Sequence, residues 1–492
     1  MTNPVDQFLA SLDEISQLDP AARAALAAQA DQLARREQVS AVTADALDAM
    51  LHALVAHDAR RLEQESPQAV AAVLELLWRG CQAIAAECRA TDDRPWPENP
   101  DLVPRIAAVY QHMGTASGFR FQLLKCLTEI GNDEALEQFA ELLVLDPPGH
   151  EEQAVLAFAP LFQRPNASAG VLFPRLLDGL SHVQIAAPIL DLANHLHRTQ
   201  TVARHPAAEH VHALASLLGQ VVQQLQKLTE KNPLNDPAQS SEQLKSSAEK
   251  VAAGSALTVA LCDALGGIGN HDVVGSLYNA LELPHRRIKT EAAAALARLD
   301  QPAGEEALRQ LVEDPTTRFR ALAYLEELGR VELVDEAFRT PAARAEGELA
   351  LWLAEPTQFG WPPAEMELLD ETTQYWPGFD QPQPCYLFRF TYRLRENELN
   401  GVGIAGPLVY AVSVDLADLP PADIYALYAG WQAEHAEISE RAFATLSEAE
   451  QQTVAQQLET AAADQYEQPR PAAVGLLLGE LHVIATASRA GT

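Results

Sequence analysis

Cysteine is scarce in this chain of 492 residues, and its few copies are scattered. An odd number of cysteines without a CxxC pair is typical of a reduced, intracellular protein and not of a disulfide-stabilised one. The N-terminal stretch MTNPVDQFLASLDEISQLDP has neither a basic start nor an apolar core, so we expect no signal peptide. Runs of about 18 apolar residues, the length that crosses a bilayer, are also missing. We therefore expect a soluble, cytoplasmic protein, whose five cysteines are Cys81, Cys88, Cys126, Cys262 and Cys385.

Positive charge is also scarce. The chain has 35 Lys and Arg against 68 Asp and Glu, which gives a formal net charge of −33 at pH 7. No long window gathers enough Lys or Arg to reverse this sign locally, and so acidic a surface repels phosphate backbones and anionic lipids. We therefore expect no nucleic-acid or membrane partner. The charge favours a basic protein segment as the partner, because opposite charges accelerate encounter.

Catalytic and cofactor motifs are missing as well. The sequence has no G-x-S-x-G, no HExxH and no G-x-x-x-x-G-K-[ST], and its many acids are spread along helical faces that we expect to be solvated. The one glycine pattern, GVGIAG at Gly401, Gly403 and Gly406, matches GxGxxG. A dinucleotide loop needs a strand before it and a helix after it, whereas Gly406 is followed by Pro407 and a strand-like LVYAVSVDL. We expect these glycines to form a turn and a bulge between antiparallel strands, with no cofactor bound.

The first 350 residues or so are rich in Ala, Leu, Gln and Glu with helical periodicity. The segments Ala21–Gln38, Ala46–Gln64 and Gln68–Ala90 predict three early helices. Because 48% of the residues are hydrophobic and 21% charged, the chain is globular, and its length exceeds one compact core. The sequence therefore predicts a mainly α protein of two or three units.

A repeat follows. Leu123–Pro147 can be laid over Leu261–Pro284, and both contain a helix that ends in Ile-Gly-Asn. We expect the Gly to end one helix in the left-handed conformation and the Asn to begin the next. Thr290–Pro315 and Arg320–Phe338 continue the pattern, with turns 31 and 29 residues apart at Ile268, Leu299 and Leu328. This spacing is typical of two-helix solenoid units, which bury their apolar stripes against neighbouring units.

The pattern A-L-x-x-I-G-N-x-x-x-V-x-x-L-x-x-A-L in Ala264–Leu281 resembles the HEAT-like repeat first associated with phycobilisome lyases. The third turn departs from it with Asp300 for Gly, and the fourth with Arg330 for Asn. The C-terminal series LFRFTYRL, GVGIAGP and DIYALYAGWQ is similar to the tails of large bacterial HEAT-repeat proteins of uncharacterised function. The resemblance implies an α-solenoid of HEAT-like pairs, which such proteins use as a scaffold for protein–protein interaction on the concave surface. The lyase resemblance also implies an alternative, a bilin lyase-like or pigment-handling chaperone or enzyme.

Composition divides the chain into five segments. The N-terminal helical region covers 1–100, helical repeats 101–228 and 255–354, and a small α+β module 355–492. Between the repeats, residues 229–254 gather Pro, Asn, Ser and three of the six lysines, which predicts a polar linker or loop.

The C-terminal module combines strands and helices. Pro384–Leu394 alternates strictly and predicts a half-buried strand with one aromatic face. We expect this face to pack on a helix over Pro420–His435, whose own apolar face is Ile424, Leu427, Tyr428 and Trp431. Residues 447–465 predict another helix, and residues 471–487 a hairpin that turns at Gly479–Glu480. An antiparallel sheet follows from these predictions.

Two groups of side chains are candidates for binding. Trp361 and Trp376 each precede a Pro in a predicted loop. An aromatic side chain on such a loop is a candidate for a protein interface, and packing as a cap against the last repeat is an equal alternative. Five histidines lie within 18 residues, but no cysteine or carboxylate pair completes a zinc site nearby, so a partly exposed polar loop is the simpler interpretation. They are His195, His197, His205, His210 and His212.

Overall fold

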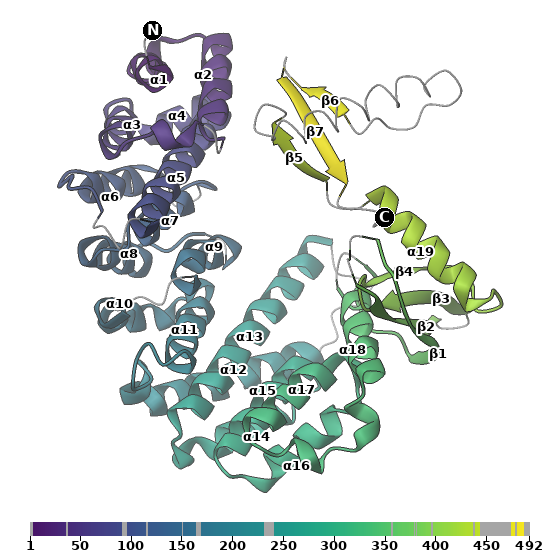
Figure 1. Ribbon diagram of the computed structural model, residues 1–492. Helices are drawn as coiled ribbons and strands as arrows, with labels where there is room; N and C mark the ends of the chain where they lie inside the picture. Colours follow the sequence, from purple (N-terminus) through teal and green to yellow (C-terminus); the bar gives the residue numbers. More distant parts are fainter. Residues whose placement is uncertain are drawn as a thin grey trace, which may run out of the picture. The chain divides into compact units, whose positions relative to one another are not determined.

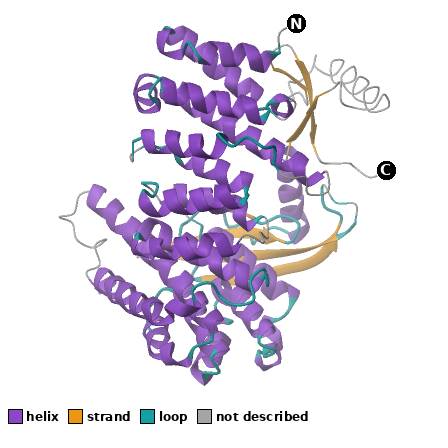
Figure 2. Ribbon diagram, turned by 90° about the vertical axis from the view of Figure 1, so that its left-hand side faces the viewer, coloured by secondary structure: helices purple, strands orange, loops and turns teal. Residues whose placement is uncertain are grey.

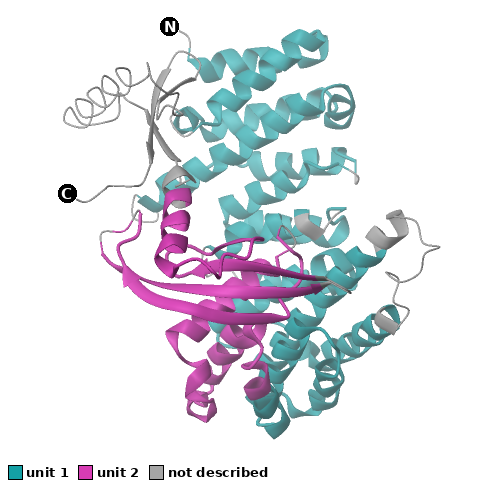
Figure 3. Ribbon diagram, turned by 90° about the vertical axis from the view of Figure 1, so that its right-hand side faces the viewer, with its two compact units in different colours: residues 1–307 teal, residues 308–492 magenta. Residues whose placement is uncertain are grey.

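The structure is a computed structural model of the whole chain. It describes residues 3–35, 38–90, 96–114, 117–149, 151–163, 169–230, 241–355, 358–377, 379, 381–394, 397–435, 438–442, 474–477 and 480–486. The chain is mainly helical, with a small four-stranded antiparallel sheet towards the C-terminus. It divides into two compact units, Met1–Ala307 and Leu308–Thr492 (Figure 3).

Helices make up the first unit (Figure 1). They are α1 (Pro4–Leu12), α2 (Pro20–Leu33), α3 (Ala44–Ala56), α4 (Ala59–Glu65), α5 (Pro67–Ala90), α6 (Leu102–His112), α7 (Phe121–Ile130), α8 (Asp133–Leu145), α9 (Glu151–Phe162), α10 (Ala169–Leu176), α11 (Val183–Arg198), α12 (Val211–Glu230), α13 (Ser241–Ile268), α14 (Val274–Leu281) and α15 (Arg286–Arg298). Short 3₁₀ turns are η1 (Ile15–Gln17), η2 (Val39–Ala41), η3 (Leu177–Ser181), η4 (Ala208–His210) and η6 (His271–Val273). Helix α16 (Pro302–Leu311) runs across the boundary between the units.

The helices of the first unit form two layers. In one layer α5 packs on α7, and α9, α11, α13 and α15 follow, each on its predecessor. In the other layer α6 packs on α8, α8 on α10, and α12 on α14. We call the first set, α5, α7, α9, α11, α13 and α15, the odd-numbered layer. Figure 2 shows helices of this unit stacked in successive rows. Apolar side chains from successive helices gather in buried clusters.

The turns between paired helices have the predicted conformations. Gly131 ends α7 with φ 68°, and the side chain of Asn132 accepts the Ala135 N–H at 2.9 Å to begin α8. Gly269 repeats this conformation with φ 78°. Asp300, which replaces Gly in the third turn, also has a positive φ of 53°, a conformation that side chains other than Gly adopt at an energetic cost. The glycine–asparagine roles predicted from the sequence are thus confirmed at the first repeat.

Two predictions of helix boundaries were wrong. The segment Ala46–Gln64 is not one helix, because Asp58 adopts φ 57° and its side chain caps α4. The predicted linker 229–254 is also helical at both ends, since α12 reaches Glu230 and α13 begins at Ser241. Apolar side chains of α13 such as Val251 pack into the core of α12 and α13, and this burial outweighs the poor helix propensity of the local serines.

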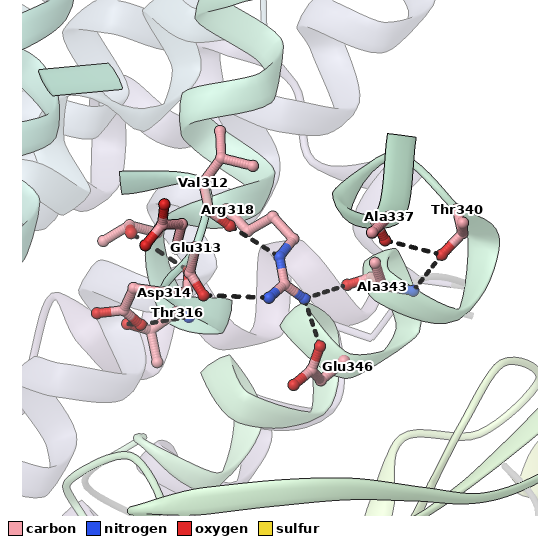
Figure 4. A network of polar contacts seen from close by, with 10 residues as sticks. Val312, Glu313, Asp314, Thr316, Arg318, Ala337, Thr340, Ala343 and Glu346 are labelled. Atoms are coloured by element: carbon pink, nitrogen blue, oxygen red, sulfur yellow. Dashed lines mark hydrogen bonds and ion pairs between the residues drawn. The ribbon is translucent and has the colours of Figure 1, made fainter. Parts of the chain in front are cut away.

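The second unit begins with a helical pair, α17 (Pro315–Glu327) and α18 (Pro341–Leu353), separated by η7 (Val331–Leu333) and η8 (Glu336–Phe338). Arg318, only 3% exposed, joins the pair (Figure 4). Its guanidinium donates to the carbonyl oxygens of Val312 and Ala343, both at 2.9 Å, and forms an ion pair with Glu346. Because the last carbonyl groups of a helix have no intrahelical partners, this arginine satisfies the buried acceptor that Val312 presents after the end of α16. At Ala343 it adds a donor to a carbonyl group in the first turn of α18.

The sheet of the second unit has the order β1-β2-β3-β4, with every neighbouring pair antiparallel. Its strands are β1 (Glu365–Gln374), β2 (Gln383–Leu394), β3 (Asn397–Ala405) and β4 (Tyr410–Val412), and helix α19 (Pro421–His435) follows. The predicted aromatic face of β2 is buried, but the helix that covers it is α18, through Leu349 and Leu353. Helix α19 covers the opposite face, where Ile424 packs with Leu387. The predicted helix partner was therefore wrong: helices precede and follow the sheet at similar distances in the sequence, and the one that precedes it covers the aromatic face.

This packing explains where the unit begins. Leu349 of α18 is fully buried in the same core as the aromatic face of the sheet. The predicted boundary between residues 354 and 355 therefore differs from the division at 307 and 308, because it separates α18 from the sheet that α18 covers.

Of the three GVGIAG glycines, Gly406 lies in the predicted turn, with φ 124° between the antiparallel strands β3 and β4. The predicted bulge is wrong, because β2 and β3 pair in continuous register through Gly401 and Gly403. Gly401 and Gly403 lie within β3, opposite Phe390 and Phe388. A Cβ atom on Gly401 would lie 2.4 Å from Cζ of Phe390 and 2.4 Å from the Val412 carbonyl oxygen. The pattern thus makes room for aromatic rings inside a sheet, and the register shift that the structure shows is between Leu368 and Asp370 of β1.

A second, three-stranded sheet has the order β5-β7-β6, from β5 (Ile438–Ala442), β6 (Val474–Leu477) and β7 (Glu480–Thr486). The predicted hairpin is confirmed by the antiparallel pairing of Leu477 with Glu480. The helix predicted over residues 447–465 lies outside the described residues.

Two helical segments, Pro67–Ala90 and Ser247–Ile268, are long and apolar enough to cross a membrane by length and composition alone. Within the most apolar window of each, 61% and 56% of the residues are buried inside the chain. Core helices share these properties, so the two segments are weak evidence for membrane insertion.

Candidate functional site

The odd-numbered layer carries a charge network that joins three consecutive helices. Asp263 of α13 accepts from Arg198 of α11 at 2.6 Å and from Arg298 of α15 at 3.1 Å. The side chains of Asp263 and Arg298 are 11% and 13% exposed, whereas that of Arg198 is 51% exposed. Asn194, about one turn before Arg198 on α11, donates to the Ala260 carbonyl oxygen at 3.1 Å. The network therefore fixes the register of α11, α13 and α15 and opens to solvent at its Arg198 end.

Asp191 lies one turn from Asn194 on the same helix and differs from Asp263. Its side chain is exposed, and it makes no ion pair with any residue that the structure describes. Desolvation by the surrounding helices nevertheless raises its pKa to about 6, against the opposing effect of Arg287. Neighbouring protein atoms replace part of the bulk water around this carboxylate, which disfavours its charged form. Asp191 can therefore accept a cationic group from a partner.

A second polar cluster lies on α5 and α7, in the same layer. The ammonium group of Lys125 lies 3.1 Å from the ring centroid of Trp78, and Arg79 lies over the same ring at 4.5 Å. Burial lowers the pKa of Lys125, while Glu75 acts in the opposite direction. Glu75 accepts from Arg79 at 2.9 Å, and Gln122 donates to it at 3.1 Å. Cation–π contacts and hydrogen bonds thus hold these charges in place without a direct ion pair to Lys125 among the described residues.

The histidine-rich segment is only partly the exposed loop that the sequence predicted. His195 and His197 belong to α11, whereas His205 is 3% exposed. The His205 Nε2–H donates to Asn194 Oδ1 at 2.9 Å, and its Nδ1 accepts the Ala207 N–H at 3.1 Å. Burial lowers the pKa of His205 to about 4, so the ring is neutral at pH 7.

No group of His, Cys, Asp or Glu side chains in the described ranges has the arrangement of a metal site. His197 and His205 instead lie edge to face, 5.5 Å apart, beside a cavity of about 680 Å³. The Gly267–Asp272 turn forms its other wall. The remaining two histidines, His210 and His212, are exposed.

The two candidate tryptophans have opposite environments. Trp361 is 52% exposed, and its carbonyl oxygen accepts the Tyr392 hydroxyl at 2.9 Å. Trp376 is 2% exposed and packs with Cys385 and Leu387 in the core under α19. Trp376 is therefore not the accessible aromatic residue on a loop that the sequence predicted. Of the two tryptophans, Trp361 has the side chain that a partner could reach.

The sequence analysis missed a groove between β4 and α19, which we call the strand–helix groove. It has a volume of about 460 Å³. Leu427 was assigned to the buried face of α19, but it is 55% exposed, and Tyr425 takes the buried position with 3% exposure. A helical stripe of apolar residues does not tell which of them a neighbour covers. The lining residues are Tyr410, Val412, Leu416, Ala426, Leu427, Tyr428, Gly430 and Trp431.

Comparison with protein-family models, with curated proteins and with solved structures finds no match to this chain.

Proposed function

We propose that the chain is a non-enzymatic scaffold whose first unit is an α-solenoid of HEAT-like helical pairs. Its odd-numbered layer forms the concave surface that binds a protein partner. The consecutive packing of α5 to α15, with one turn geometry recurring at Gly131 and Gly269, supports the solenoid arrangement. The protein acts in the cytoplasm, without nucleic acid or membrane as its partner.

The unpaired carboxylate of Asp191 carries this proposal. Around it, Arg198 and Arg298 are engaged by Asp263, so Asp191 is the acid of this group that is open to an incoming cation. A Lys or Arg side chain of a partner would pair with this carboxylate, and the opposite charge would compensate the cost of its partial desolvation. A basic segment laid across α11, α13 and α15 is the partner that fits a chain of net charge −33.

The proposal is tested by co-purification of tagged full-length chain from its native cells, with quantitative mass spectrometry and an absorption spectrum of the eluate. Asp191→Lys reverses the charge of the proposed contact and should reduce the recovery of the bound protein about tenfold or more. Glu282→Lys, the same change at the exposed end of α14, is the matched control and should leave recovery unchanged.

Equal recovery with both variants, or no bound protein with the wild type, would contradict this function. A coloured eluate that contains a pigment would contradict it too, and would favour the pigment-handling alternative.

A further inference from the structure

The strand–helix groove of the second unit brings together a sheet edge and an apolar helix surface. The first is a sheet edge: β4 pairs with β3 on one side, and no described strand pairs with its other side. The second is an apolar wall supplied by α19 beside that edge (Figure 1). A strand edge offers backbone donors and acceptors, and a neighbouring helix offers side-chain pockets.

The floor of the groove is built from stacked aromatic rings. The rings of Tyr410 and Trp431 lie 4.0 Å apart between centroids at an interplanar angle of 20°, which joins β4 directly to α19. Tyr428 closes the base, where its hydroxyl donates to the Val402 carbonyl oxygen at 2.5 Å. These contacts hold the two walls at a fixed separation, so the groove is formed before anything binds.

Apolar side chains remain exposed along the rim. Leu427 is 55% exposed, Val414 57% and Leu419 42%, and Leu416 between the last two lines the groove itself. Several exposed apolar side chains on one short segment beside a groove are typical of an interaction site.

Acidic residues accompany this apolar surface. Asp415, Asp418 and Asp423 lie in the segment that links β4 to α19 and at the start of α19. Asp415 is paired with Arg389 at 2.6 Å, whereas Asp418 and Asp423 make no ion pair with any described residue. The rim therefore attracts positive charge, and a second copy of this chain, with its own net charge of −33, is disfavoured as the occupant.

We infer that the strand–helix groove binds an extended, basic segment of a partner protein, which adds to the β4 edge as a further strand. One apolar side chain of the segment enters the pocket between Leu427 and Trp431. Lys or Arg side chains beside it face Asp418 and Asp423. This site lies in the second unit and does not depend on the proposed role of the odd-numbered layer.

Gly430 provides a sharp test. It lies on α19, lines the groove, and a Cβ atom added there would meet no atom within 4 Å. Gly430→Leu would therefore fill the groove without a clash and would favour the helix, because Leu has a higher helix propensity than Gly. Gly275→Leu on α14, where an added Cβ also meets nothing within 4 Å, is the matched control.

The probe is a fluorescein-labelled peptide in which Lys alternates with Val and Ile, and binding to the full-length chain is measured by fluorescence anisotropy. We expect it to bind the wild type and the Gly275→Leu variant equally, and the Gly430→Leu variant about tenfold or more weakly. The same peptide with Glu for Lys should bind about tenfold or more weakly to the wild type. A central Pro should also weaken binding, because it removes a backbone donor that a ladder strand needs.

Several results would overturn the inference. They are no binding of the Lys peptide, equal binding to both leucine variants, or equal binding of the Glu peptide. A drop in the melting temperature of Gly430→Leu relative to Gly275→Leu would mean that the chain itself fills the groove. Dimers of the wild type that Gly430→Leu abolishes would mean that a second copy fills it.

Discussion

The two units of this protein use polar and apolar side chains in opposite ways. In the odd-numbered layer of the first unit, charges lie between packed helices and are held in networks, such as Arg198–Asp263–Arg298. In the second unit, helices cover both faces of a sheet with apolar side chains, and the groove left at one edge is lined by aromatic and aliphatic groups. The difference teaches that packed helix pairs can bury charge where several helices share it, whereas a sheet covered by helices leaves its apolar side chains accessible where the cover ends.

The largest expected effect concerns the helical pair of the second unit. Arg318→Ala should lower the free energy of unfolding by about 3–5 kcal/mol, because it removes the cation that pairs with Glu346 and leaves the Val312 carbonyl group at the end of α16 without its donor. Urea unfolding followed by circular dichroism measures this loss. Arg344→Ala is the control, because its ion pair with Glu326 is about half exposed and should contribute less than about 1 kcal/mol. Similar losses for the two variants would show that Arg318 does not join α16, α17 and α18.

A smaller loss is expected in the charge network of the first unit. Asp263→Ala should cost about 3 kcal/mol, because it leaves the largely buried Arg298 without its carboxylate. The control is Glu209→Ala, which removes an ion pair with Arg204 whose side chains are 69% and 74% exposed. If Asp263→Ala unfolds at the same urea concentration as Glu209→Ala, the network is not what fixes α11, α13 and α15 together.

The stability of the sheet should depend on side-chain volume, whereas the stability of the helical layer depends on charge pairing. Gly401→Ala should cost about 2 kcal/mol, because the new methyl group would overlap the Phe390 ring and the Val412 carbonyl oxygen. Gly219→Ala on α12, where an added Cβ meets nothing within 4 Å, should instead stabilise by about 0.5–1 kcal/mol. Thermal unfolding of both variants measures these differences. A Gly401→Ala variant as stable as the wild type would contradict the close packing of Gly401 against Phe390 in the sheet.

The smallest expected effect depends on pH. The pKa of Asp191 is raised from 3.8 to about 6, so the folded state binds more protons than the unfolded state between these values. Stability from this group therefore falls as the pH rises through that window. Asp191→Asn should be more stable than the wild type by about 1 kcal/mol at pH 7, after allowance for the exposure of the carboxylate, and equal to it below about pH 4. A difference that does not vary between pH 4 and pH 7 would contradict the partial desolvation of Asp191.

The sequence predicted the features that depend on local chemistry. The Gly131–Asn132 turn follows from residue types that adopt a left-handed helix end and cap the next helix, and the alternation in β2 predicts a strand with one aromatic face. The sequence pattern did not predict which elements pack together when they are far apart in the chain. Whether the aromatic face meets α18 or α19 depends on the path of the chain between them, and both helices present apolar stripes.

The candidate sites show the same limit. Trp376 was expected on a loop surface because it precedes Pro377, but burial depends on α19, which comes about 45 residues later and covers it. Asp191 looks like any other acid on a helix, and its raised pKa arises from neighbouring helices. Residue spacing along the chain therefore predicts helices, strands and turns. The burial and the pKa of the candidate site residues depend on neighbours that only the folded structure identifies.

The most direct test of the central claim is the salt dependence of partner recovery on tagged full-length chain, measured by quantitative mass spectrometry as sodium chloride is raised. If the odd-numbered layer binds a basic segment by charge, recovery from wild-type chain should fall steeply with salt, and Asp191→Lys should remove most of that dependence. Recovery that does not change with salt, in either chain, would contradict binding by the odd-numbered layer through its charges.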